Sequence, residues 1–121
     1  MSLTEAEAIA DIIDKYIGSA RTGSARRMRE IWLDHARIVG TFDGQPVNRT
    51  ADAFSERIGQ SGGAPNVRGR AVSIGRSGPA ATACIEIEDW DGVRSTDLFA
   101  LFKADGRWRV AGKVFDAHAR R

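Results

Sequence analysis

Residues 93–116 read VRSTDLFALFKADGRWRVAGKVFD and contain two apolar alternations joined by Asp105-Gly106. An Asp-Gly pair between two alternating runs is a strong short-range signal for a two-residue β-hairpin. Side chains alternate along a strand, so Asp97 shares a face with Phe99 and Leu101. A carboxylate in such apolar company needs a hydrogen-bond or charge partner, or stays protonated. Asp97 is therefore the first residue to consider for chemistry, although it could also lie at a solvated strand start, bonded to a nearby backbone N–H.

This hairpin belongs to a longer run of predicted strands. Short Ser-Gly or Asp-Gly turns separate four strands, which we expect at residues 67–76, 79–90, 93–103 and 107–116. An earlier hairpin is predicted from residues 36–42 and 45–49, because Asp43-Gly44 is typical of a type I′ turn. The second half of the chain is thus predicted to be an antiparallel meander.

The first half of the chain contains the helical patterns. Thr4 and Glu7 form a predicted capping box at the start of the first helix. The apolar face of this helix carries Tyr16, and the helix is expected to end at Gly18 and the residues after it. Ser24 and Thr50 are predicted to cap two shorter helices. Helices followed by antiparallel strands indicate an α+β fold, and 121 residues suffice for one domain, residues 1–121.

Composition and charge exclude several classes of protein. The chain is 42% hydrophobic and 28% charged with a formal net charge of +2, which is ordinary for a globular protein and gives no argument for a nucleic-acid surface. The single cysteine, Cys84, excludes an intrachain disulfide and suits a reducing compartment. No signal peptide or membrane-spanning run is recognised. We therefore predict a cytoplasmic protein without a membrane or nucleic-acid partner.

The strand that carries Asp97 is apolar on both faces. Leu98, Ala100 and Phe102 point away from the face of Asp97. Three short helices can cover only one face of the sheet, so the other face needs a second cover. The expected partner is a second copy of the chain, in a two-fold homodimer.

The order of elements resembles the nuclear transport factor 2-like (NTF2-like) superfamily, with its SnoaL-like, putative lumazine-binding-like branch as the most similar. The motifs that carry this resemblance are Thr96-Asp-Leu-Phe99, Asp105-Gly-Arg-Trp108, Arg109-Val-Ala-Gly-Lys-Val-Phe115, Tyr16 and Trp32-Leu-Asp-His-Ala36. The resemblance covers nearly the whole chain and implies a cone-shaped, cystatin-like fold. In that fold three N-terminal helices pack on a curved antiparallel sheet of about six strands around a deep, mostly apolar pocket. Members include enzymes and plain binding modules, so the fold alone does not decide the function.

A resemblance to ketosteroid isomerases within that superfamily suggests roles for two residues. Those enzymes bind a substrate oxygen with a tyrosine and a protonated aspartic acid. By position, Tyr16 resembles the tyrosine and Asp97 the acid. The position of their catalytic base falls at Gly40 or Thr41, and neither residue can act as that base. Tyr16 and Asp97 could therefore polarise a ligand oxygen, or could simply be satisfied core polar groups.

The remaining site candidates are one histidine and a set of aromatic residues. His35 could act as a general base, or could instead bond the carbonyls at a helix C-terminus. Six aromatic residues are candidates for a pocket wall that would take a small apolar or aromatic ligand: Trp32, Phe42, Phe54, Trp90, Phe99 and Phe115. No cofactor or metal site is predicted. We expect a small-molecule-binding protein, or alternatively an isomerase, cyclase, dehydratase or hydrolase that uses Tyr16, Asp97 and His35.

Overall fold

Helices precede and cover a sheet in the computed structural model, which describes residues 3–118. The chain begins with α1 (Leu3–Thr22) and α2 (Ala25–Glu30), followed by the strands β1 (Trp32–Phe42) and β2 (Gln45–Thr50) and by α3 (Ala51–Ser61). The meander then consists of β3 (Arg68–Ser77), β4 (Ala80–Trp90), β5 (Val93–Ala104) and β6 (Arg107–Ala117). None of the helices in residues 3–118 is long and apolar enough to cross a membrane.

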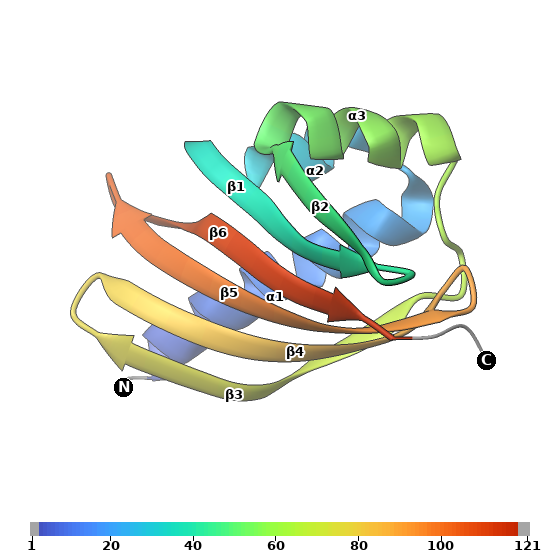
Figure 1. Ribbon diagram of the computed structural model, residues 1–121. Helices are drawn as coiled ribbons and strands as arrows, with labels where there is room; N and C mark the ends of the chain where they lie inside the picture. The colour runs from blue at the N-terminus through green and yellow to red at the C-terminus, as the bar shows by residue number, and fades with distance from the viewer. Residues whose placement is uncertain (1–2, 119–121) are drawn as a thin grey trace.

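The strands form one curved sheet in the order β2-β1-β6-β5-β4-β3. Neighbouring strands are antiparallel except β1 and β6, which run parallel, so the sheet is mixed. All three helices lie on the same, concave side of the sheet (Figure 1). The predicted α+β, cystatin-like architecture is therefore confirmed, with one parallel pairing that joins the N-terminal hairpin to the meander.

Burial along β5 follows the alternation that the sequence predicts. Asp97, Phe99 and Leu101 are buried on the concave face, whereas Leu98 is 50% and Phe102 is 42% exposed on the other face. The helices supply the rest of the core, which includes the fully buried Tyr16, Ile9 and Met28. The concave face and the helices thus share a single hydrophobic core.

Turn and cap residues behave as their chemistry predicts. Asp43 and Gly44 both have positive φ angles, of 50° and 74°, as a type I′ turn requires. The hydroxyl groups of Ser24 and Thr50 accept hydrogen bonds from backbone N–H groups in the first turns of α2 and α3. These two predicted helix caps are confirmed.

The predicted start of α1 is wrong, whereas its end lies among the residues after Gly18, as predicted. The helix already includes Leu3, so Thr4 lies inside it and cannot be its N-cap. The helix also continues through Gly18 to Thr22, because Ser19 and Ala20 are fully buried and hold this turn against the core. Packing of the last turn outweighs the roughly 1 kcal/mol that a glycine costs inside a helix.

Two register irregularities shape the middle of the sheet. Leu101 pairs with Val110 but Ala100 pairs with Gly112, so Ala111 is an extra residue in β6. In β1, Trp32 pairs with Val110 and Arg37 with Gly112, so residues 33–36 bulge opposite Ala111. A bulge of one residue exchanges the faces of all side chains beyond it.

Candidate functional site at the concave face

Tyr16 of α1 and Asp97 of β5 meet on the concave face, as their positions in the sequence suggest. The Tyr16 hydroxyl donates a hydrogen bond of 2.8 Å to Asp97 Oδ2, and both residues are almost fully buried. The other carboxylate oxygen, Oδ1, accepts a 2.6 Å hydrogen bond from the Ser95 hydroxyl. Both Asp97 oxygens are therefore acceptors, which is the opposite of the donor role that the isomerase resemblance implies.

Lys113 of β6 completes this cluster, and the sequence analysis missed it. Its side chain is 4% exposed, and its Nζ atom donates a 2.7 Å hydrogen bond to the Tyr16 hydroxyl oxygen. The same Nζ atom lies 3.7 Å from Asp97 Oδ2. A buried ammonium group needs such a charge partner, because burial of an unpaired charge is very unfavourable. We call Tyr16, Ser95, Asp97 and Lys113 the polar cluster.

Aromatic rings surround the Lys113 ammonium group. Its Nζ atom lies 4.6 Å from the ring centroid of Phe54, 4.7 Å from that of Phe115, 5.1 Å from that of Tyr16 and 5.8 Å from that of Trp90. All four distances are within the range in which an aromatic face attracts a cation. Three of the six predicted wall residues, Phe54, Trp90 and Phe115, therefore lie around a cation of the chain itself.

Burial and charge shift the pKa values of two members of the polar cluster. Burial lowers the pKa of Lys113; the nearby Asp97 carboxylate opposes this shift, and the positive charge of Arg49 adds to it. Burial also raises the pKa of Tyr16 well above its ordinary value, and the Asp97 charge adds to that shift. Tyr16 thus keeps its proton at neutral pH and can act as a hydrogen-bond donor.

Gly40 shows why no carboxylate stands on β1 beside this cluster. A Cβ atom at Gly40 would lie 2.1 Å from the Phe115 carbonyl oxygen and 2.5 Å from an atom of the Phe115 ring. Any side chain at this position would therefore force Phe115 and its strand to move. Thr41 is exposed and donates a hydrogen bond to Asp116. Neither position can hold the base that the ketosteroid isomerases carry.

The other predicted site residues fall into two groups. Trp32 and Phe99 are buried and pack against the Tyr16 ring, with ring centroids 6.2 Å and 5.0 Å away. His35 is exposed within the β1 bulge, and Phe42 at the end of β1 is 41% exposed. The structure thus brings Tyr16, Asp97 and five of the six aromatic residues together, but leaves His35 and Phe42 outside.

Two open hollows stand out among the described residues, with volumes of about 420 Å³ and 370 Å³. Neither is lined by Tyr16, Asp97 or Lys113. The deep apolar pocket that the resemblance implies is not among them. The Lys113 side chain and its aromatic neighbours lie beside Tyr16. Within residues 3–118, no three side chains of His, Cys, Asp or Glu gather as a metal site would require.

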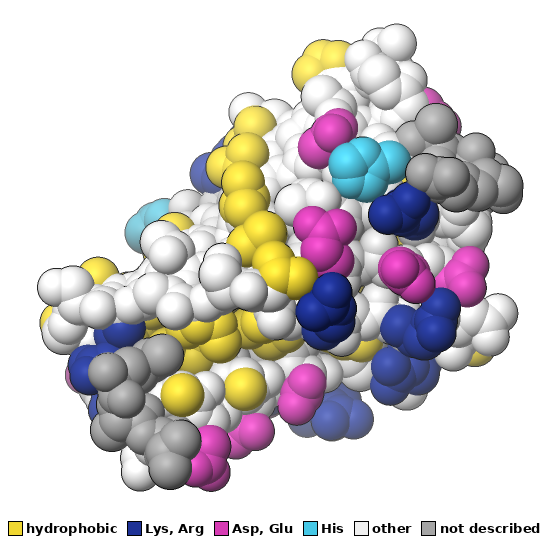
Figure 2. Space-filling view, turned by 90° about the horizontal axis from the view of Figure 1, so that it is seen from below, with side chains coloured by type: hydrophobic (Ala, Val, Ile, Leu, Met, Phe, Trp, Pro, Cys, Tyr) yellow, Lys and Arg dark blue, Asp and Glu magenta, His cyan; other side chains and the backbone are white. Residues whose placement is uncertain are grey.

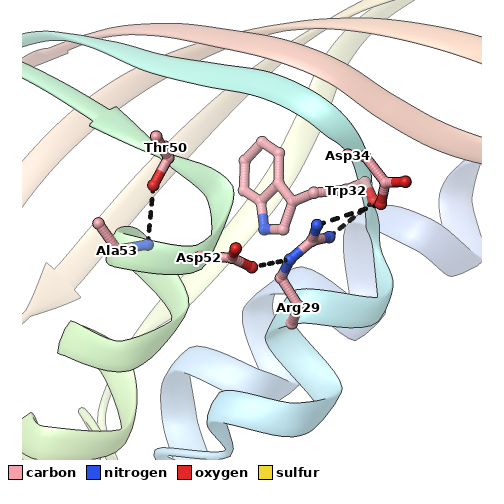
Figure 3. A network of polar contacts seen from close by, with 6 residues as sticks. All are labelled: Arg29, Trp32, Asp34, Thr50, Asp52 and Ala53. Atoms are coloured by element: carbon pink, nitrogen blue, oxygen red, sulfur yellow. Dashed lines mark hydrogen bonds and ion pairs between the residues drawn. The ribbon is translucent and has the colours of Figure 1, made fainter.

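A second polar network borders the larger hollow (Figure 3). Arg29 of α2 donates to the Trp32 carbonyl oxygen and pairs with the carboxylates of Asp34 in β1 and Asp52 in α3. The hydroxyl of Thr50 caps α3 beside this network by accepting from the Ala53 N–H. Arg29 therefore ties α2, β1 and α3 to one another.

Comparisons with known proteins agree with this architecture. A family model described as putative lumazine-binding matches residues 4–116. The structure is similar to crystal structures of NTF2-like proteins of unknown function from Methylobacillus flagellatus KT and Shewanella baltica OS155. The first has a TM-score of 0.92 and 28% identity over 98% of this chain and 96% of that chain. The second has a TM-score of 0.89 and 26% identity over 98% of both chains. No curated protein matches the sequence.

Proposed function

Because this chain belongs to the putative lumazine-binding family and has the NTF2-like fold, we propose that it binds a small organic molecule at the polar cluster. The observation that carries this proposal is the Lys113 ammonium group, which is 4% exposed, bonded to Tyr16 and surrounded by aromatic rings. Burial of a lysine is costly, and a hydrophobic residue of similar size would often be as stable or more stable there. A binding function explains why a lysine occupies this position.

The cluster suits a flat molecule that carries a carbonyl or anionic oxygen. The Lys113 ammonium group has N–H groups for that oxygen besides the one that it donates to Tyr16, and Tyr16 holds the ammonium group in position. The surrounding rings supply apolar faces for the body of the molecule. Trp90 and Phe115 are only half-buried, so the ligand reaches the cluster from their side by displacing these two rings. Lumazine, which the family description names, belongs to this class of flat carbonyl compounds.

The hydrogen bond between Tyr16 and Asp97 supports a second candidate function. In an isomerase, cyclase, dehydratase or hydrolase, the Tyr16 hydroxyl would turn its proton from Asp97 to a substrate oxygen and stabilise the charge that develops on that oxygen. His35 is exposed and outside the cluster, so Lys113 is a better placed group for proton transfer. Turnover of a bound compound that is lost in Tyr16→Phe would favour this function over simple binding.

The binding proposal can be tested by a thermal-shift screen of flat, carbonyl-bearing aromatic compounds. Calorimetric titration then compares the wild type with Lys113→Met and Tyr16→Phe, and with Lys103→Met as the control. Lys103 pairs with Glu5 and lies outside the polar cluster. We expect each cluster variant to weaken binding by about tenfold, which corresponds to about 1.4 kcal/mol, with no change in the control. Equal affinities in all four proteins would refute the proposed site.

The convex face of the sheet supports the predicted homodimer, which we also propose. The cross-strand pairings place Val39, Val114 and Leu98 next to one another, and these side chains are 40%, 57% and 50% exposed. Figure 2 shows hydrophobic side chains in a continuous row on this face. A second copy of the sheet would cover the row.

Sedimentation velocity at micromolar concentration tests the dimer, with Val114→Glu as the disrupting variant. We expect a dimer for the wild type and a monomer for Val114→Glu. A wild-type monomer would refute the assembly without affecting the binding proposal. A cytoplasmic location, inferred from the single thiol of Cys84, also stays a prediction.

A further inference from the structure

The larger hollow lies where β1 separates from β6. The bulge of residues 33–36 moves β1 away from β6 between the paired positions Trp32–Val110 and Arg37–Gly112. The start of β6 and the helix α2 form the other walls of this open hollow, which has a volume of about 420 Å³. Bulges often accompany such sites because they re-aim the side chains of a strand.

Four arginine side chains line this hollow: Arg26 and Arg29 from α2, and Arg107 and Arg109 from β6. Within residues 3–118, Arg26, Arg107 and Arg109 have no hydrogen bond or ion pair to another side chain. The sequence places Arg26 and Arg29 between 78 and 83 residues before the other two, so only the fold brings these charges together. We call these four residues the arginine hollow.

The acidic residues in the same walls do not pair with Arg26, Arg107 or Arg109. Asp34 pairs with Arg29 at 3.3 Å, and Glu30 pairs with Lys15 at 3.4 Å. Each carboxylate is therefore already balanced by a different cation. Three unpaired guanidinium groups that face one hollow repel one another, and a bound anion would relieve this repulsion.

Arg29 gives the arginine hollow a fixed wall. Its guanidinium group is held by Asp34, by Asp52 and by the Trp32 carbonyl oxygen, as Figure 3 shows. The remaining arginines stand around this fixed group with all their donors unused among the described residues. Guanidinium groups bind phosphate oxygens with two parallel hydrogen bonds, so several of them around one hollow suit a phosphate group.

We infer that the arginine hollow is a binding site for a small molecule that carries phosphate groups. The site is separate from the polar cluster, since none of Tyr16, Asp97 and Lys113 lines it. It therefore does not depend on the function proposed above. The phosphate-bearing molecule need not be the flat carbonyl compound that we propose for the polar cluster.

Calorimetric titration of the full chain with pyrophosphate at low ionic strength tests this inference. The informative variants are Arg107→Gln and Arg109→Gln, separately and combined. Arg70→Gln is a control with the same change of net charge. Arg70 is exposed on β3, the edge strand at the opposite end of the sheet from β2 and β1. Lys113→Met is a second control that alters the polar cluster only.

The expected result is saturable binding of pyrophosphate by the wild type and by both controls. Loss of one arginine should weaken the affinity about tenfold, and loss of two should weaken it further. No saturable binding by the wild type would overturn the inference. An equal loss in Arg70→Gln would also overturn it, because the effect would then reflect net charge alone. Circular dichroism verifies that each variant is folded.

Discussion

Replacement of Lys113 by methionine tests whether this lysine and Asp97 form a coupled buried pair. Methionine fills a similar volume without the ammonium group, so Asp97 becomes a buried carboxylate that lacks its cation. Removal of one partner of a buried ion pair costs about 3–5 kcal/mol. Asp97 retains its hydrogen bonds from Tyr16 and Ser95, which places the expected loss near the lower end, at about 3 kcal/mol.

The matching single variant is Asp97→Asn, which leaves Lys113 as an uncompensated buried cation. We expect it to lower the free energy of unfolding by about 3 kcal/mol as well, for the same reason. The double variant, Lys113→Met with Asp97→Asn, contains neither charge. Its loss should therefore be clearly smaller than the sum of the two single losses, with a coupling energy of about 2 kcal/mol.

Urea unfolding at pH 7, followed by circular dichroism, measures all four free energies. Lys103→Met serves as the control, since Lys103 and Glu5 form a partly exposed pair whose loss should cost far less than the loss of Lys113. Two outcomes would refute the reasoning. One is a loss below about 1 kcal/mol in both single variants, and the other is additivity within about 0.5 kcal/mol, which would mean that the charges do not interact.

Three further predictions address the pH dependence, the tight contact at Gly40 and a helix cap. Tyr16 is the only tyrosine, and its pKa is raised in the folded chain. Above about pH 10 the unfolded chain therefore loses the phenol proton while the folded chain keeps it, so the free energy of unfolding should fall with rising pH. Urea unfolding at several alkaline pH values should show this fall in the wild type and not in Tyr16→Phe. An ultraviolet titration of the folded wild type that gave an ordinary tyrosine pKa would contradict this prediction. Gly40→Ala should lower the free energy of unfolding by about 2–3 kcal/mol, because the new Cβ atom would clash with Phe115. Gly75→Ala is the control and should be nearly neutral, because the nearest atom to its Cβ would be 3.5 Å away. Thr50→Ala should lose about 1 kcal/mol in the same assay through loss of the cap of α3, and a Thr50→Ser variant that is equally destabilised would argue against the cap.

The residues of the polar cluster that the sequence predicts, Tyr16 and Asp97, are those whose position follows from the regular period of a helix or a strand. The period of two placed Asp97 with Phe99 on a buried face, and the helical pattern placed Tyr16 on the inner side of α1; both expectations are confirmed. The contact between them follows because α1 crosses the concave face of a sheet whose middle strands include β5 (Figure 1). Alternation along a strand is sufficient to predict the face of a side chain when no bulge lies in that strand between the turn and the residue.

Lys113 could not be predicted in this way because of the extra residue Ala111. A regular hairpin from the Asp105-Gly106 turn would keep Trp108, Val110 and Val114 on one face and would expose Lys113. The bulge reverses this order, so that Lys113 is 4% exposed and Val114 is 57% exposed. The sequence contains no signal for the position of a bulge that is as specific as an Asp-Gly turn.

Lys113 also explains why the ketosteroid isomerase comparison holds for positions but not for chemistry. In those enzymes the aspartic acid is neutral and donates a hydrogen bond, which an apolar environment makes possible. Here a cation lies 3.7 Å from Asp97, and two hydroxyl groups donate to its oxygens. Asp97 is therefore the counterion of Lys113 and the acceptor for the single O–H group of Tyr16, so the ligand proposed above would bond to N–H groups of the Lys113 ammonium group.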